Sequence, residues 1–61
     1  MDTVTIYQDH AEEWRWRRQA ANHEIIGDSG EGYIRKSAAV TMAEHVNGPE
    51  SEDVHYVIEG D

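Results

Sequence analysis

The sequence has no cysteine, only one proline, only one lysine (Lys36) and no long apolar run. Without cysteine the fold cannot be stabilised by disulfides, and nothing points to an oxidising compartment. No apolar stretch approaches the roughly 20 residues that a membrane-spanning helix needs. The first residues, Met1 to Val4, lack the basic start and apolar core of a signal peptide. We therefore expect a cytoplasmic protein.

The chain is short enough that its own core is thin. A domain of about 60 residues buries only about 60% of the surface that its unfolded chain exposes. Scaffolds of this size are usually stabilised by disulfides, a metal or a partner subunit. With disulfides excluded, a partner subunit is the first expectation.

Acidic residues dominate the composition. Thirteen Asp and Glu oppose five Lys and Arg, which gives a net charge of −8 at pH 7. Such self-repulsion destabilises a compact state in dilute buffer. At about 1 M salt the Debye length falls to roughly 3 Å, so most of the repulsion is screened. This favours the protein of a salt-loving organism over an ordinary acidic protein.

Alternating apolar residues predict strands, because side chains of a strand point to opposite faces in turn. Val4 and Ile6 alternate with polar residues, and so do Trp14 and Trp16. A different spacing appears later: apolar residues recur at the helical intervals i, i+3, i+4 and i+7, and Asn47-Gly48-Pro49 then ends the pattern. This helical stripe consists of Ala39, Met42, Ala43 and Val46. The expectation is one α+β domain over 1–61 in the order βββαβ, with strands near 3–8, 13–20, 24–29 and 54–59 and a helix near 36–47.

The two hairpins can be given a register. A two-residue turn at Asn22-His23 would set Ala21 opposite Glu24 and, further along, Arg17 opposite Asp28. The first loop must have an odd length, three or five residues around 9–11, since a one-residue slip would exchange the two faces. The face that the helix covers would then carry Val4, Ile6, Trp14, Trp16, Ala20 and Ile25.

The last strand is too apolar to stand alone. Val54, Tyr56 and Ile58 share one side of it, and one helix over three short strands leaves them with little cover. We expect a second copy of the chain to bury them together with Trp14 and Trp16. A twofold homodimer is the commonest closed arrangement.

The segments EWRWR (13–17), AAN (20–22), EII (24–26) and SGEGY (29–33) together resemble the YegP-like family of small, functionally uncharacterised proteins. The resemblance covers roughly residues 4 to 47. It implies an antiparallel sheet with one helix packed on one face, and two such units in an intertwined dimer that exchanges C-terminal strands. It carries no catalytic residue and no cofactor. The chain departs from the family at three positions, Glu12, Arg18 and His23.

The tetrapeptide Gly27-Asp28-Ser29-Gly30 has the same sequence as the residues around the catalytic serine of chymotrypsin-like proteases. A nucleophilic serine needs a histidine base within hydrogen-bond reach and an oxyanion hole, and the chain is several times shorter than such a protease. The favoured interpretation is a glycine-rich turn, formed by Gly30 and Gly32, with Tyr33 packed before the helix. Binding of an anion by the backbone amides of this turn is the other alternative.

The segment WRWRR interleaves aromatic and basic residues. Arg15, Arg17 and Gln19 would share the outer sheet face and are the candidate binding residues. Nucleic acid or an acidic partner is one interpretation, but few bases stand among many acids and such binding weakens in salt. The favoured interpretation is a solvated strand in which the arginines pair with Asp28 and neighbouring acids.

No metal site or cofactor is predicted. His10, His23, His45 and His55 are scattered without the paired spacing of metal ligands. The sequence therefore predicts a homodimeric, acidic structural or binding module rather than an enzyme. Its only expected partner is itself: nucleic acid is disfavoured, a membrane is not expected, and no protein partner can be named.

Overall fold

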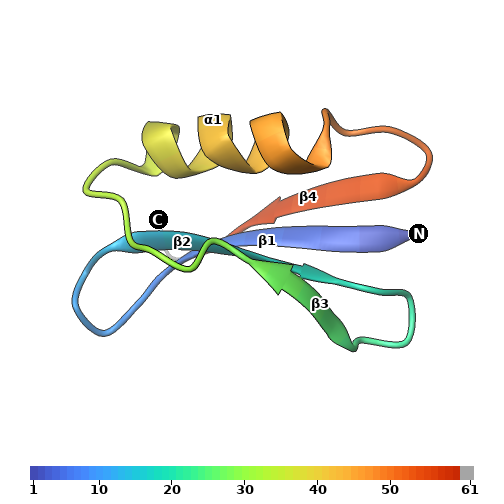
Figure 1. Cartoon of the computed structure of the whole chain (residues 1–61), viewed down its shortest axis with the longest axis horizontal. Coiled ribbons are helices and arrows are strands. Elements are labelled where there is room, and N and C mark those ends of the chain that lie inside the picture. The colour runs from blue at the N-terminus through green and yellow to red at the C-terminus, as the bar shows by residue number, and fades with distance from the viewer. Residues whose placement is uncertain (60–61) are drawn as a thin grey trace.

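The chain folds into four strands and one helix in the order βββαβ, as shown by a computed structural model that describes residues 1–59 (Figure 1). The elements are β1 (Asp2–Gln8), β2 (Trp14–Gln19), β3 (Ile25–Asp28), α1 (Lys36–Asn47) and β4 (Val54–Ile58). The α+β class and the helix bounds agree with the prediction. The last two residues of the predicted domain 1–61 lie outside the described residues. Among those described, no helix is long and apolar enough to cross a membrane.

The strands form one sheet in the order β3-β2-β1-β4. β1 pairs antiparallel with β2, and β2 with β3, but β4 lies parallel to β1. The predicted antiparallel sheet is therefore wrong in one pair, and the sheet is mixed. The reason is the long connection after β3: α1 carries the chain back across the sheet, so β4 starts at the same end as β1 (Figure 1).

The first hairpin has the register that the apolar pattern requires. Ile6 pairs with Trp16 and Gln8 with Trp14, which leaves a five-residue connection, 9–13, and confirms the predicted odd length. Within it the Glu12 N–H donates to the Asp9 carbonyl at 3.0 Å, and Glu12 has a φ of 62°. A side chain in this left-handed region is unfavourable, and glycine is the residue that adopts it without strain.

The second hairpin differs from the prediction near its turn. The Ala20 N–H donates to the Glu24 carbonyl at 2.8 Å, so the loop has three residues instead of two. A β-bulge between Arg18 and Gln19 then restores the predicted pairs further along, among them Arg17 with Asp28. The bulge also turns Ile25 away from the helix, and this side chain is 58% exposed. Its predicted place beside the tryptophans is wrong.

His23 is the left-handed residue of this second loop, with a φ of 70°. Replacing it with glycine removes the strain but adds freedom to the unfolded chain, so His23→Gly is expected to raise the free energy of unfolding by about 0.5–1 kcal/mol. Ala21→Gly is the control, because Ala21 has a negative φ and glycine there only adds freedom. It should lower stability by a similar amount in urea titration. Equal effects of the two substitutions would contradict the assigned loop.

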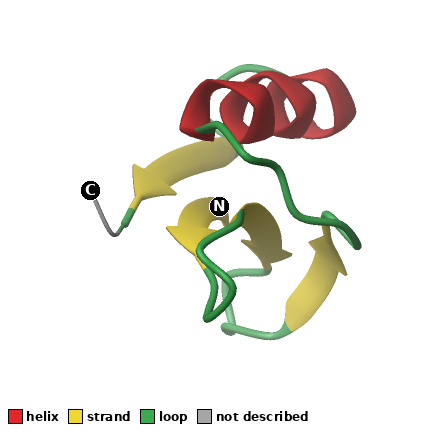
Figure 2. Cartoon of the chain, turned by 90° about the vertical axis from the view of Figure 1, so that its left-hand side faces the viewer, coloured by secondary structure: helices red, strands yellow, loops and turns green. Residues whose placement is uncertain are grey.

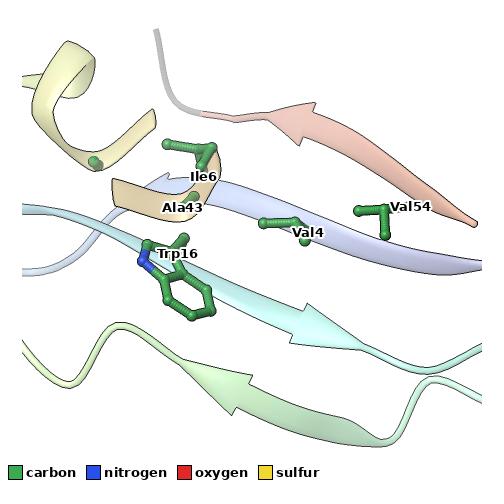
Figure 3. Packing of buried hydrophobic residues seen from close by; sticks show 6 residues of the cluster. Val4, Ile6, Trp16, Ala43 and Val54 are labelled. Carbon is green, nitrogen blue, oxygen red and sulfur yellow. The ribbon is translucent and has the colours of Figure 1, made fainter. Parts of the chain in front are cut away.

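The core lies between α1 and one face of the sheet, the helix face (Figure 2). Val4 and Ile6 are fully buried there, and Trp16 is 5% exposed, as predicted for this tryptophan (Figure 3). Val54 of β4 closes the core at one end, while Trp14, Tyr33, Val40 and Tyr56 pack against it from partly exposed positions. The buried cluster comprises Val4, Ile6, Trp16, Ala39, Ala43 and Val54.

The helix meets the sheet through its alanines. Ala39 and Ala43 are fully buried, but Met42 is 38% exposed and Val46 60% exposed. The predicted stripe of four apolar residues is therefore only half right. Small alanines let α1 lie close to the strands, and the partly buried side of the helix continues through Val40 instead of Met42.

Two polar links hold the C-terminal end of α1. The Arg18 guanidinium contacts Asp2 Oδ2 through Nε at 2.9 Å and through NH2 at 2.8 Å. Its NH1 donates to Asn47 Oδ1 at 3.3 Å, so Arg18 joins β1 to the helix instead of lying free. The Tyr56 hydroxyl of β4 donates to the carbonyls of Ala43 and Gly48, which ties β4 to the helix end.

Candidate functional site

The face of the sheet opposite α1, the open face, carries the predicted binding residues. Strand alternation places Thr5 and Tyr7 of β1 next to Arg17 and Arg15 of β2. Thr5 lies between Arg17 of β2 and Val57 of β4 and is only 4% exposed. The residues of the open face are Thr3, Thr5, Tyr7, Arg15, Arg17, Gln19, Ile25, Asp28, His55 and Val57.

Arg15 is bound to the first loop. Its Nε donates to Asp9 Oδ2, and its NH2 lies 3.9 Å from Glu13 Oε1. The other Asp9 oxygen accepts the backbone N–H groups of Ala11, at 2.9 Å, and of Glu13, at 3.0 Å. Asp9 therefore organises the loop and neutralises Arg15. Apart from the general preference of aspartate for turns, no sequence pattern indicates this role.

The bond from Arg15 holds the pKa of Asp9 below its usual value, and the Glu13 N–H lowers this pKa further. A lowered pKa in the folded state means that the ionised carboxylate stabilises the fold at pH above the unfolded value of about 3.9, and that this stability is lost as the pH falls below it. Asp9→Asn should therefore be less stable than the natural chain near neutral pH.

The difference between Asp9→Asn and the natural chain should shrink below about pH 4. Urea titrations of both chains across the acidic range measure this difference directly, since acid-induced changes elsewhere cancel between them. Parallel stability curves down to the lowest pH would contradict the assigned role of Asp9.

Arg17 differs from Arg15 in its contacts. Its guanidinium carbon lies 4.7 Å from the centre of the Tyr7 ring, a cation–π contact. The predicted pairing with Asp28 is present in the backbone register, but no ion pair joins the two side chains within the described residues. Gln19 is also occupied, because its Nε2 donates to the His23 carbonyl at 3.0 Å. Of the three candidate binding residues, Arg17 is the one with a charge not matched by a carboxylate.

The glycine-rich turn lies between β3 and α1. The Ser29 hydroxyl donates to the Glu31 carbonyl at 2.8 Å, so its proton is engaged in a hydrogen bond within the turn. Gly30 has a φ of 73°, which favours glycine. At Gly32 a Cβ atom would lie 2.4 Å from Glu13 Oε1, so only glycine fits without moving that side chain.

Tyr33 closes this turn. Its backbone N–H and C=O exchange hydrogen bonds with Trp14 at 2.8 and 2.7 Å, so the chain returns to the edge of β2 before the helix begins. The Tyr33 hydroxyl lies 3.2 Å from Glu31 Oε1. Partial burial, and then the Glu31 carboxylate, raise the pKa of Tyr33. These contacts agree with the interpretation of SGEGY as a turn.

No histidine of residues 1–59 belongs to a group of three or more metal-ligating side chains. His55 Nδ1 lies 3.4 Å from Glu50 Oε2, in the linker before β4. Within residues 1–59 no group of three or more metal-ligating side chains is found, and no pocket is present in this part of the chain.

The outer edge of β4 is the least protected part of the sheet. The Asp53 carbonyl accepts the Asp2 N–H of β1, and the Glu59 N–H donates to the Ile6 carbonyl of β1. The N–H and C=O groups of the odd-numbered residues in this segment therefore face β1. Those of Val54, Tyr56 and Ile58 face away from the sheet. A turn occupies the Val54 carbonyl, which accepts the Ser51 N–H at 2.9 Å. The other outward groups have no strand partner among the described residues.

The opposite edge of the sheet is protected. β3 has four residues, contains the irregular pairing at the bulge, and ends in the carboxylate of Asp28. Bulges, short length and charged residues are the usual ways in which proteins keep an edge strand from pairing. β4 has five residues, no bulge, no proline and no Asp, Glu, Lys or Arg.

Comparison with known proteins places the chain among uncharacterised proteins. Two relatives, the UPF0339 protein NMB1088 of Neisseria meningitidis serogroup B and the UPF0339 protein NMA1193/NMA1859 of serogroup A, are each 61% identical over 31 residues. The matched part is 51% of this chain and 54% of each relative, so the chain spans about half the length of these curated relatives. No solved structure matches the chain significantly. Residues 9–49 match the domain of unknown function DUF1508, and the chain therefore belongs to the DUF1508 family.

Proposed function

We propose that the chain is a non-enzymatic structural or binding module that acts as a cytoplasmic homodimer, joined along β4 and adapted to high salt. The observation that carries the proposal is the unprotected outer edge of β4. An edge that is neutral and regular is a template for pairing with another strand. In a chain with a net charge of −8, a strand without charged side chains is also the place where two copies can approach.

The strand is self-complementary about Tyr56. In an antiparallel pair of two β4 strands, Tyr56 would face Tyr56 of the second copy, and Val54 would face Ile58. All three residues direct their backbone groups outward, so this register would use the outward N–H and C=O groups of both strands, with the Val54 carbonyl accepting a second bond beside the one from Ser51. Two four-stranded sheets would then form one continuous sheet.

Pairing in this register would extend the core across the interface. Val54, Tyr56 and Ile58 alternate onto the helix face, where their β1 neighbours are Asp2, Val4 and Ile6. Ile58 is 50% exposed in the single chain although Ile6 beside it is fully buried. A second β4 would cover Ile58, which supplies apolar burial that a core of six buried residues lacks.

The same register predicts a dependence on salt. Asp53 would approach Glu59 of the second copy at both ends of the interface. Two carboxylates facing each other across strands are destabilising, and salt screens exposed charges. The dimer should therefore become tighter as salt increases.

Exchange of the C-terminal strands, which the family resemblance implies, is compatible with this interface. The linker 48–53 between α1 and β4 has six residues and could span at most about 20 Å. A five-residue strand is about 17 Å long, so the linker could place β4 in the position of the other copy's β4. The same contacts would then form between chains.

The test compares two isoleucine-to-lysine variants. Ile58→Lys puts a charge at the β4 edge, whereas Ile34→Lys makes the same change at a side chain that is 89% exposed and away from β4. For a chain of 7.0 kDa the dimer has a molar mass of 14.0 kDa (2 × 7.0). Light scattering should give the dimer for Ile34→Lys and its loss for Ile58→Lys. A folded Ile58→Lys chain that still has the dimer mass would refute the interface.

A further inference from the structure

We infer that Asn47-Gly48 is a site of spontaneous covalent modification whose rate is set by the contact of Tyr56 with the end of α1. Asparagine followed by glycine is the sequence most prone to deamidation, because glycine leaves the attacking backbone nitrogen unobstructed. Asn47 is the last residue of α1, and Gly48 caps the helix with a φ of 84°. The inference does not depend on the dimer.

The reaction takes place within the two residues. The Gly48 nitrogen, after losing its proton, attacks Asn47 Cγ, and the side-chain nitrogen leaves as ammonia. The product is a five-membered succinimide ring. Water then opens the ring at one of its two carbonyls, giving aspartate or isoaspartate at position 47. Water is the only other reactant, and no oxidant or reductant is needed.

In the folded chain, hydrogen bonds engage both the Gly48 N–H and the Asn47 side chain, the groups that must react. The Gly48 N–H donates to the Glu44 carbonyl at 2.8 Å as the last helical bond. Asn47 Nδ2 donates to the Ala43 carbonyl at 2.9 Å, and Oδ1 accepts from Arg18. A helical backbone at Asn47 also keeps the Gly48 nitrogen turned into the helix. Cyclisation therefore requires the last turn of α1 to open.

Tyr56 controls that opening. Its hydroxyl donates to the carbonyls of Ala43 and Gly48, on both sides of Asn47. Helix ends open locally unless other contacts hold them. Because Tyr56 lies on β4, departure of β4 from its place would free the last turn and expose Asn47 to the reaction.

The product changes the contacts at the end of α1 and the start of the linker to β4. Aspartate at position 47 would present a carboxylate to Arg18 and lose the bond to Ala43. Isoaspartate would lengthen the backbone at the start of the linker 48–53, which leads to β4. Chains in which β4 has been displaced would thus be marked permanently at the residue that precedes the linker.

The experiment incubates the natural chain and Tyr56→Phe in mildly alkaline buffer and follows deamidation at Asn47 by peptide mass spectrometry. Phenylalanine keeps the ring and removes both hydroxyl bonds. Loss of a hydrogen bond of ordinary strength should speed the reaction roughly fivefold. Unfolding in urea should give the highest rate. Asn22, which is exposed and followed by histidine, serves as a reference within each chain.

Two results would overturn the inference. One is an equal rate at Asn47 in the folded natural chain and in urea, since the fold would then give no protection. The other is an equal rate in the natural chain and Tyr56→Phe. Circular dichroism establishes that the variant is folded. If it is not, Arg18→Met decides, because it frees Asn47 Oδ1 and should also accelerate the reaction relative to Asn22.

Discussion

Trp16→Ala is expected to leave the chain unfolded at room temperature. Trp16 is the largest side chain of the buried cluster and is 5% exposed, next to the fully buried Ile6 with which it pairs. Truncating a buried tryptophan to alanine lowers stability by about 3–5 kcal/mol. Typical stabilities per residue imply only roughly 3–9 kcal/mol for a chain of this length.

Circular dichroism and urea titration at high salt measure the effect of Trp16→Ala. Ile34→Ala, at an exposed position, is the control and should change stability by less than about 0.5 kcal/mol. Trp16→Phe should fall between the two, because it retains an aromatic ring in the core. A folded Trp16→Ala chain with nearly natural stability would show that the core is not where we place it.

Ala39→Leu is the second substitution with a large expected effect. Ala39 is fully buried between α1 and the sheet, and the close approach of the helix depends on its small side chain. Extra methylene groups in a packed core force side chains and backbone to shift, which lowers stability by about 1–3 kcal/mol. The helix must move away from the strands or lose its contacts with Tyr56 and Arg18.

Thr41→Leu is the matched control for Ala39→Leu, since it introduces the same side chain on the exposed side of the same helix. It should leave the urea midpoint nearly unchanged. If the two leucine variants were equally stable, the helix could not be packed against the sheet through Ala39.

Local sequence patterns were sufficient for the bounds of the helix and for the choice of faces in the first hairpin. The pair Asn47-Gly48 followed by proline ended the helix where α1 ends, because Gly48 adopts a positive φ there. The requirement that Ile6 and Trp16 share a face predicted an odd-length first loop, of three or five residues, and the structure has five. Both predictions rest on interactions between near neighbours or on strict alternation.

Other features depend on contacts that alternation cannot reveal. The bulge at Arg18 and Gln19 moved Ile25 to the other face, since one extra residue exchanges the faces of a strand. The parallel pairing of β4 with β1 depends on the path of the chain after β3. The rotation of α1 toward Ala39 and Ala43 depends on how closely a helix can approach the sheet.

The candidate site was predicted in part. Alternation placed Arg15 and Arg17 correctly on the open face, but their partners come from other parts of the chain. Asp9, in the first loop, binds Arg15, and Tyr7, on β1, lies under Arg17. The contact of Tyr56 with the helix end also joins segments that are separate in sequence. A single sequence gives no signal for such pairs.

The molar mass of the folded chain, measured by light scattering from dilute to molar salt, tests the proposed dimer most directly. We expect every folded sample to have the mass of two chains, 14.0 kDa (2 × 7.0), with dissociation and unfolding together as salt is removed. A compact species of 7.0 kDa in dilute salt would contradict both the dimer and the need for screening.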